Sequence, residues 1–530
     1  RRPIGSQRFP DGMYREQNIT FREINTDFLL SYNKRFNDFS TVVSVGANRM
    51  TQTTSENLIE GRGLAIPAIY TLGNINVQPI LNRFNGEKRI NSVYAFANLG
   101  YKDFLYLDLT VRNDWSSTLP RENNAYFYPA ASLSFIPSEL INFGRAVDYL
   151  KVRFNVARVG NDTDPFQLTR TYQFATLPNS VTNPSLLPYA NLRPVQTDSY
   201  EFGLKGNLFK NRLGFDFTYY NTKSKDQIIS AGISEASGFS STVINAGEIE
   251  SEGIELALNA TPVRMENGFQ WDVGVNFTRN RSYVNELAPG IETFIVGFGP
   301  AGATVEARPA GRMGDIYGEV FLRNPEGEIV FDENGLPVID PERKTIGNYN
   351  PDYLVGLTTG FQFKGFFANA VLDIRRGGII YSYTNAIGAE SGLLTHSLPG
   401  RETGLVGDGV ALNAEGDYIP NETNVSPETW YYGGFYRRSN IEANSFAADF
   451  MKLRELSVGY RLPQPFAKKL GLNNLSIAFV GHNVALWTDV PNIDPEAHAL
   501  NGGTLVPGFE VTQLPSAQSF GVKLNAGFYN

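Results

Sequence analysis

The stretch YLKVRFNVARV, residues 149 to 159, alternates apolar and polar side chains. Leu150 and Val152 fall on one face of an extended strand, because strand side chains alternate with period two. Lys151 and Arg153 fall on the opposite face. The fold depends on what contacts each face, which is either a protein core and water, or lipid and a wet channel.

The same alternation recurs along the chain, for example in FLYLDLTVRND at 104–114 and RLGFDFTYYNT at 212–222. Repeated short alternating segments separated by turn residues predict an all-β fold with about fifteen strands. The strands are expected near residues 25, 45, 96, 109, 131, 154, 203, 220, 255, 275, 358, 371, 456, 481 and 524.

Short and long connections alternate between these strands, which is typical of an up-and-down barrel in an outer membrane, with short periplasmic turns and long external loops. The prediction is therefore a transmembrane up-and-down antiparallel β-barrel. The longest connections span about 284 to 350 and 377 to 446, and PSELINFGRAVD and PQPFAKKLGLNN are each expected to contain a helical turn. Tight turns are expected at Asn37-Asp38, Lys102-Asp103, Lys210-Asn211 and Lys364-Gly365.

The composition agrees with this fold and excludes several classes of function. Aromatic residues make up 13% of the chain, with 26 Tyr and 37 Phe, as expected of long strands with aromatic belts. No run of about eighteen apolar residues occurs, so a membrane-spanning helix is not expected. The net charge of -8, with mixed signs, argues against a nucleic-acid partner. The absence of cysteine excludes disulfides, thiolate metal sites and thiol catalysis.

The alternation of connections also gives the strand direction. The first strand, near residues 13 to 33, leads into a tight turn and so runs from outside to periplasm, as does the strand that ends at Asn530. A barrel that begins and ends in the periplasm would then have an odd number of strands ahead of Arg1. Open sheet edges in lipid would cost on the order of tens of kcal/mol, so further strands are expected from an upstream segment or another chain.

The apolar strand faces are expected to contact outer-membrane lipid, and the polar faces a lumen or whatever fills it. Tyr126, Phe127 and Tyr128 lie near a strand end, where an amphipathic ring suits the lipid headgroup level. The predicted lumen-facing residues are Asp108, Arg112, Lys151, Arg153, Glu201, Lys205, Asp216, Glu255, Asp272 and Lys523.

Seven stretches of the chain together resemble the SusC/RagA-like family of TonB-dependent outer-membrane transporters of Bacteroidota. They are LTVRNDWSSTLP, NNAYFYPAASLSFIPSE, NRLGFDFTYYNTKSKDQI, INAGEIESEGIELALNATPV, DFMKLRELSVGYRLP, VGHNVALWT and PGFEVTQLPSAQSFGVKLN. The resemblance implies a barrel of 22 strands. Residues 1–530 would form its C-terminal portion with about 15 of them, and the first strands and an N-terminal plug would be absent from this chain.

The resemblance further implies TonB-dependent import of oligosaccharides or oligopeptides across the outer membrane of a Gram-negative bacterium. A SusD-like surface lipoprotein would cap the mouth, and the TonB complex would act through the absent plug. Two rivals stay open: a receptor for iron chelates or vitamins without a lid, and a structural or secretion-linked barrel with no import role. A soluble enzyme or adhesin is a third class, which solubility without detergent would favour.

Three motifs carry possible cofactor or metal chemistry, but their context favours turns. GFGPAG at 297–302 matches a dinucleotide-binding pattern, yet Pro300 and Pro309 leave no helix on which a pyrophosphate could sit. GNDTDP at 160–165 and FDENGLP at 331–337 lack the spacing of an EF-hand and are expected to form Asx and Gly turns.

The histidines give no further site. His396, His482 and His498 lack the spacing of a zinc site or a catalytic triad. The carboxylates of the predicted lumen face are interleaved with lysine and arginine, so hydration and plug contact are favoured over acid catalysis. No catalytic residue, cofactor or metal is therefore assigned, and the chain is predicted not to be an enzyme.

The most suggestive loop stretch is TWYYGGFYRR, residues 429 to 438. Its rings suit either a self-packed loop core, a lid interface or direct contact with substrate, because flat amphipathic rings serve all three. The candidate ligand or lid contacts are Trp430, Tyr431, Tyr432, Phe435 and Tyr436.

Overall fold

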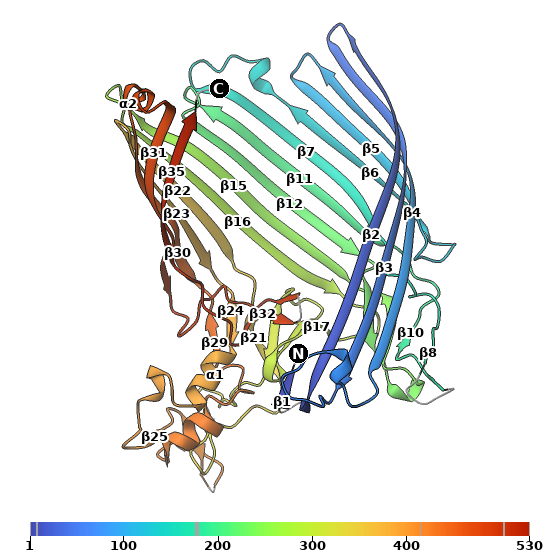
Figure 1. The fold of residues 1–530 in the computed structure, drawn as a ribbon, viewed down its shortest axis with the longest axis vertical. Coiled ribbons are helices and arrows are strands. Elements are labelled where there is room, and N and C mark those ends of the chain that lie inside the picture. Colours follow the sequence, from blue (N-terminus) through green and yellow to red (C-terminus); the bar gives the residue numbers. More distant parts are fainter. Residues whose placement is uncertain (1, 7–8, 175–179, 414, 502–503, 529–530) are drawn as a thin grey trace. The chain divides into compact units, whose positions relative to one another are not determined.

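The computed structural model describes residues 2–6, 9–174, 180–413, 415–501 and 504–528, and its main feature is an antiparallel sheet of 16 strands (Figure 1). In sheet order the strands are β1 (Arg2–Ser6), β2 (Phe9–Phe36), β3 (Phe39–Arg62), β4 (Ile80–Tyr101), β5 (Leu105–Ser116), β6 (Ala125–Phe135), β7 (Val147–Asn161), β11 (Val195–Leu208), β12 (Leu213–Lys225), β15 (Glu248–Arg264), β16 (Gln270–Glu286), β22 (Tyr353–Phe363), β23 (Phe366–Arg376), β30 (Phe450–Arg461), β31 (Leu472–Thr488) and β35 (Ser519–Phe528).

The strand prediction is confirmed. Strand β1 is short, and the other fifteen strands that the structure describes in this sheet coincide with the fifteen predicted positions. Each connection expected to contain a helical turn has one: the single turn η2 (Pro137–Glu139) and the helix α2 (Gln464–Lys469). The predicted tight turns contain left-handed backbone, as is typical of short hairpin loops, with positive φ at Asn37, Lys102, Asp103, Lys210, Asn211, Lys364 and Gly365.

The two longest connections are folded rather than plain polar loops, and a third folded connection follows β31. Between β16 and β22 lie β17 (Phe294–Phe298), η4 (Pro300–Gly302), β18 (Thr304–Ala307), β19 (Asp315–Gly318), β20 (Val330–Phe331) and β21 (Lys344–Asn348). Between β23 and β30 lie β24 (Ile379–Ser382), α1 (Tyr383–Glu390), η5 (Thr395–Ser397), β25 (Leu405–Val406), β26 (Val410–Leu412), β27 (Tyr418–Pro420), β28 (Asn424–Val425), η6 (Thr429–Gly434) and β29 (Ser445–Ala447). Between β31 and β35 lie β32 (Ala499–Asn501), β33 (Thr504–Val506) and β34 (Phe509–Glu510).

Contacts divide the chain into two units. The first unit comprises Arg1–Ser134, Asn155–Ser199 and Ser224–Gly247, and the second comprises Phe135–Phe154, Tyr200–Lys223 and Glu248–Asn530. The connections of the first unit contain η1 (Leu72–Asn74), β8 (Gln173–Phe174), β9 (Val181–Thr182), β10 (Leu186–Leu187), β13 (Ile228–Gly232), η3 (Glu235–Ser237) and β14 (Ser241–Asn245).

Large apolar side chains are exposed along the long strands rather than buried beneath them. Phe21 and Phe28 on β2 and Val522 and Leu524 on β35 are each more than half exposed. Monomeric soluble proteins rarely expose apolar surface on this scale, whereas lipid-facing strands do. Among the described residues, no helix is both long and apolar enough to cross a bilayer.

Candidate functional site

A polar face runs across the strands of the second unit. Asn259 pairs with Gly274 between β15 and β16, so Glu255 and Asp272, each an even number of positions away, share that face. The register continues through β22, β23, β30 and β31 to β35 and brings Lys523 onto the same face. These predicted residues therefore lie on one face of the sheet, and the expectation that it lines a lumen stays a prediction.

Arg153 organises a cluster of the other predicted residues of the second unit. Its Nη1 donates to Asp216 Oδ1 at 2.9 Å, and its Nε donates to Glu201 Oε1 at 3.4 Å. Lys205 Nζ lies 3.6 Å from Asp216 Oδ2. Lys151 is two positions before Arg153 on β7 and so shares its face. Partly exposed ion pairs of this kind add little stability, so the cluster mainly keeps the face charged but nearly balanced.

The two predicted residues of the first unit also make polar contacts. Asn98 Nδ2 donates to Asp108 Oδ1 at 2.6 Å. Arg112 donates to Asp114 Oδ1 at 2.7 Å and to Ser92 Oγ at 2.8 Å. Both residues occupy even positions of β5, and they therefore share one face of that strand.

A cavity of about 770 Å³ opens on the polar face of the second unit, beside the turn at residues 209–212. Asp216, Asn259, Asp272 and Asn369 are among the residues that line it. A Cβ added at Gly274 would lie 2.5 Å from Thr358 Oγ1, so a larger residue there would displace the hydroxyl of Thr358. The cavity therefore presents carboxylates and amides, which hydrogen-bond to polar groups such as peptide amides or sugar hydroxyls.

The connections at the other end of these strands pack into a body with its own cores. We call the described parts of residues 287–352, 377–449 and 489–518 the loop body. In the second unit, α2 lies at one end of β30 and β31, whereas α1, β24 and β29 lie at the opposite end (Figure 1). One core of the loop body joins Ala303, Val305, Ile316, Tyr381, Ile441, Ala499 and Phe509 from all three connections.

The aromatic stretch at 429–438 contributes mainly to a second core of the loop body. Trp430 and Tyr431 are buried, and Phe435 and Tyr436 pack against them. The hydroxyl of Tyr431 donates to the carbonyl of His396 at 2.9 Å. Tyr432 is 67% exposed. Of the five rings, Tyr432 is therefore the one most accessible to a ligand or lid, and that role stays a prediction.

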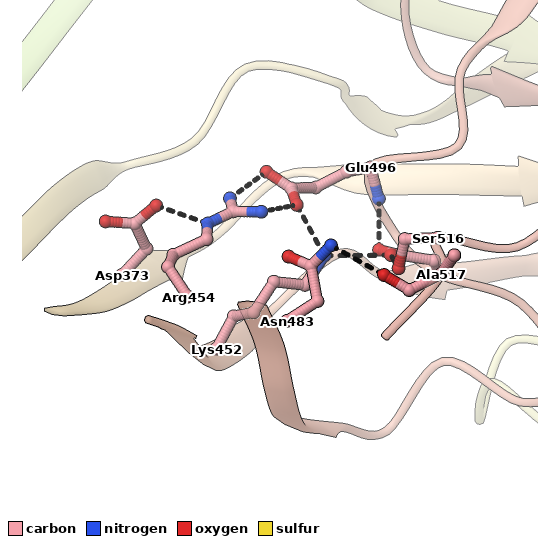
Figure 2. A network of polar contacts seen from close by, with 8 residues as sticks. Asp373, Lys452, Arg454, Asn483, Glu496, Ser516 and Ala517 are labelled. Atoms are coloured by element: carbon pink, nitrogen blue, oxygen red, sulfur yellow. Dashed lines mark hydrogen bonds and ion pairs between the residues drawn. The ribbon is translucent and has the colours of Figure 1, made fainter. Parts of the chain in front are cut away.

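An ion network that the strand pattern did not reveal joins the loop body to the sheet. Lys452 Nζ on β30 donates to Asp494 Oδ2 at 2.8 Å and to Glu496 Oε2 at 2.6 Å. Figure 2 shows Arg454 between Glu496 and Asp373 of β23, with its Nε 2.6 Å from Asp373 Oδ2. Lys452 and Arg454 are two positions apart, as are Asp494 and Glu496. The two spacings were a weak signal of the network, but pairing them requires the tertiary fold.

Two of the remaining motifs adopt turns, whereas GNDTDP at 160–165 begins with the last two residues of β7, and Asp162 accepts from other side chains instead of closing an Asx turn. Gly299 is followed by the single turn at 300–302, so GFGPAG opens no long helix. Asp332 Oδ1 accepts hydrogen bonds from the backbone N–H groups of Asn334 and Leu336, which is an Asx turn. Asp162 accepts from Lys88 and Ser116, each at 2.5 Å. In the part of the chain that the structure describes, no group of three or more His, Asp or Glu side chains could hold a metal ion.

The three histidines lie in different surroundings. His482 on β31 lies 3.7 Å from Glu455 on the polar face. His396 packs against the ring of Tyr436, and His498 belongs to the loop body. Burial, together with the charge of Arg375, lowers the pKa of His498 below its usual 6.5.

Comparison with known proteins gives one family match and several relatives. Residues 4–479 match the family model described as TonB dependent receptor-like, beta-barrel. The TonB-dependent receptor P3 of Formosa agariphila is 26% identical over 491 residues, which cover 86% of this chain and 47% of that protein. TonB-dependent receptor P39 of the same organism is 26% identical, with coverage of 97% and 54%. The chain thus spans about half the length of the curated relatives it matches.

Solved structures share the fold at lower identity. A structure of the RagAB peptide transporter is 17% identical with a TM-score of 0.71, covering 97% of this chain and 56% of that one. The RagAB peptide importer in the "open-open" state gives a TM-score of 0.73 at 17% identity, with the same coverage. At this identity the likeness concerns the fold.

Proposed function

The chain belongs to the TonB-dependent receptor-like β-barrel family, and from this premise we propose that it forms the wall and external loops of an active importer of oligopeptides or oligosaccharides. Membership places it in the outer membrane and in a transporter family rather than an enzyme family. The fold class and the family resemblance recognised in the sequence are confirmed.

The observation that carries the proposal is the two-sided sheet. One face exposes rings and aliphatic chains such as Phe479 and Val522, and the opposite face carries Asp272, Asn369 and Lys523. An apolar outside and a polar inside are what a transport barrel requires. The polar cavity described above opens on the face that we assign to the inside, and its carboxylates and amides suit a hydrogen-bonding cargo better than an apolar one.

We also propose that strands outside these 530 residues complete the wall and that a plug outside them fills its lumen. In the sheet order of the described residues, β1 and β35 each have one neighbour. Unpaired backbone groups in hydrocarbon cost several kcal/mol each, so both edges require partners in a membrane. The TonB complex would then act on the plug, which is the moving part.

A lipoprotein lid of the SusD type is the proposed partner of the loop body. The RagAB structures support this choice, because that importer has been seen in an "open-open" and a "closed-closed" state. Such states suggest a cycle of opening and closing for this chain as well. A receptor for iron chelates or vitamins would have no lid.

Deletion of the gene in its host tests the proposal. Uptake of fluorescent oligopeptides and oligosaccharides would be measured, with and without a protonophore that removes the energy for TonB. Loss of energy-dependent uptake of one of the two classes is expected, together with co-purification of a lipoprotein in mild detergent. Unchanged uptake of both classes, or a defect confined to secretion or to iron supply, would contradict the proposal.

A further inference from the structure

The Lys452 network is the most deeply buried charge cluster that the structure describes between the sheet and the loop body. The side chains of Lys452 and Asp494 are 2% and 4% exposed. Removing one partner from a buried pair leaves an uncompensated charge, which is strongly destabilising. The paired charges therefore hold residues 494–496 of the loop body to β30, and an unpaired charge at this site would weaken that attachment.

The network fastens both ends of segment 489–518, by which we mean its described residues 489–501 and 504–518. At the first end, Asp494 and Glu496 bind Lys452 and Arg454 of β30. At the second end, Ser516 donates to Asp494. The carbonyl of Ala517 also accepts from Asn483 Nδ2 of β31 at 3.0 Å. Figure 2 shows Glu496 beside Lys452 and Arg454, and Ala517 beside Asn483.

The middle of the same segment is built into the loop body. Phe509 is fully buried against Tyr381, and β34 pairs with β24. The buried carboxylate of Glu510 accepts from Ser382 Oγ at 2.9 Å and from Thr384 Oγ1 at 2.6 Å, at the start of α1. Segment 489–518 thus links the sheet to the apolar core of the loop body, with charged contacts at its two ends and the contact of Phe509 with that core between them.

We propose that segment 489–518 is a brace that locks the other two connections of the loop body, 287–352 and 377–449, to strand β30, with Lys452 and Arg454 as its positioning residues. This inference rests on the proposed function. During the cycle of opening and closing, the loop body stays fixed to the barrel wall and provides a rigid binding surface for the lid. The lid then moves relative to the loop body. Substrate capture then depends on the brace although its charged residues do not touch the substrate.

Because these 530 residues contain no cysteine, introduced cysteines can be labelled selectively within them in the complete transporter, once any cysteine elsewhere has been replaced. Spin labels at Leu393→Cys, exposed in the loop body, and at Val458→Cys, exposed on β30, report the distance between body and wall by pulsed electron resonance. We expect one narrow distance distribution that is unchanged by an oligopeptide cargo. A shift of that distribution on adding cargo would overturn the inference.

The variant Lys452→Met removes one charge and should broaden the distribution. If nine-tenths of the molecules then hold a displaced body, the apparent Kd for the peptide rises about tenfold. The double variant Lys452→Met with Asp494→Asn removes the stranded charge and keeps the bond to Ser516, so it should narrow the distribution again. Lys344→Met is the matched control, because its partner Asp340 forms an ion pair within the loop body that is open to solvent on the lysine side.

A narrow distribution in Lys452→Met, equal to that of the parent, would overturn the brace. If that variant fails to assemble, Ser516→Ala removes a single bond to Asp494 and should give a smaller broadening, and no broadening there has the same consequence. The distance measurement does not depend on import. A parent protein that binds neither peptide nor sugar would refute the proposed function. The distance measurements on the parent and the Lys452→Met variant would still test the brace.

Discussion

Lys452 and Asp494 are 42 positions apart in the chain, yet Lys452 Nζ lies 2.8 Å from Asp494 Oδ2 in a nearly solvent-free site. The pair joins a wall strand to a connection that the strand pattern alone would treat as an ordinary loop. A buried pair of opposite charges is costly to desolvate, and loss of either partner would leave the other charge in a site that water hardly reaches.

Breaking the pair from its acidic side should loosen the segment. We expect Asp494→Ala to lower the free energy of opening of residues 489–518 by about 1.5–3 kcal/mol, because Lys452 would lose one of its two carboxylate partners and keep only Glu496. Hydrogen exchange of these amides in detergent or nanodiscs measures the change. Lys344→Met should leave exchange of the segment unaltered, and equal exchange in parent and Asp494→Ala would contradict the assignment.

Acid should release the same contacts. Burial would raise the pKa of Asp494, but the bonds from Lys452 and Ser516 outweigh it and hold the pKa below the usual 3.8. Burial of Glu496 is likewise outweighed by Arg454 and Lys452, so its pKa lies below 4.5. A lowered carboxyl pKa stabilises the folded state above the usual value, and that stability is lost as the pH falls through the lowered one.

His498, whose charged neighbours are Arg375, Glu496 and Asp494, shifts the onset of this loss upward. Because its folded pKa is below 6.5, the unfolded segment binds a proton first, and stability declines as the pH falls below 6.5. Hydrogen exchange at residues 489–518 should therefore accelerate in two stages. His498→Gln should remove only the stage at higher pH. If the exchange rate, after correction for the intrinsic rate, does not depend on pH between 7 and 3, neither the histidine nor the carboxylates stabilise the segment.

The two aromatic residues Trp430 and Tyr432 should separate stability from recognition. Trp430→Ala should destabilise the loop body by about 3–5 kcal/mol, because it empties a core site. Tyr432→Ala should change stability by less than about 0.5 kcal/mol, since the ring is exposed, and should weaken lid or cargo binding. Thermal unfolding and binding of the purified lid are the two measurements. Normal binding by Tyr432→Ala would remove it from the candidate contacts.

The assignment of the two sheet faces can be tested on one strand. Val522→Lys on β35 should destabilise the barrel by about 2–4 kcal/mol if the side chain faces lipid near the membrane midplane. Asn525→Lys, on the opposite face of the same strand, should be tolerated. Folding into liposomes followed by urea titration compares them. Equal tolerance of both substitutions would show that Val522 does not face hydrocarbon.

The sequence by itself determined the strands, their tight turns and the family. Period-two alternation is a local property that each strand carries alone, as residues 149–159 show. Left-handed turn residues such as Asn37 and Lys102 are equally local. Which charged residues share a face follows from the same parity once register is known, so Asp272 and Lys523 could be predicted as one set.

Only the tertiary structure decided the partners of Lys452, the burial of Trp430 and the folded loop body. These depend on contacts between connections far apart in the chain, such as Phe509 with Tyr381, and no periodic pattern records such contacts. An exposed ring and a buried ring look the same in TWYYGGFYRR, because burial is set by what packs on top. Local alternation determines the strands of the wall, whereas long-range packing determines the structure of the loop body.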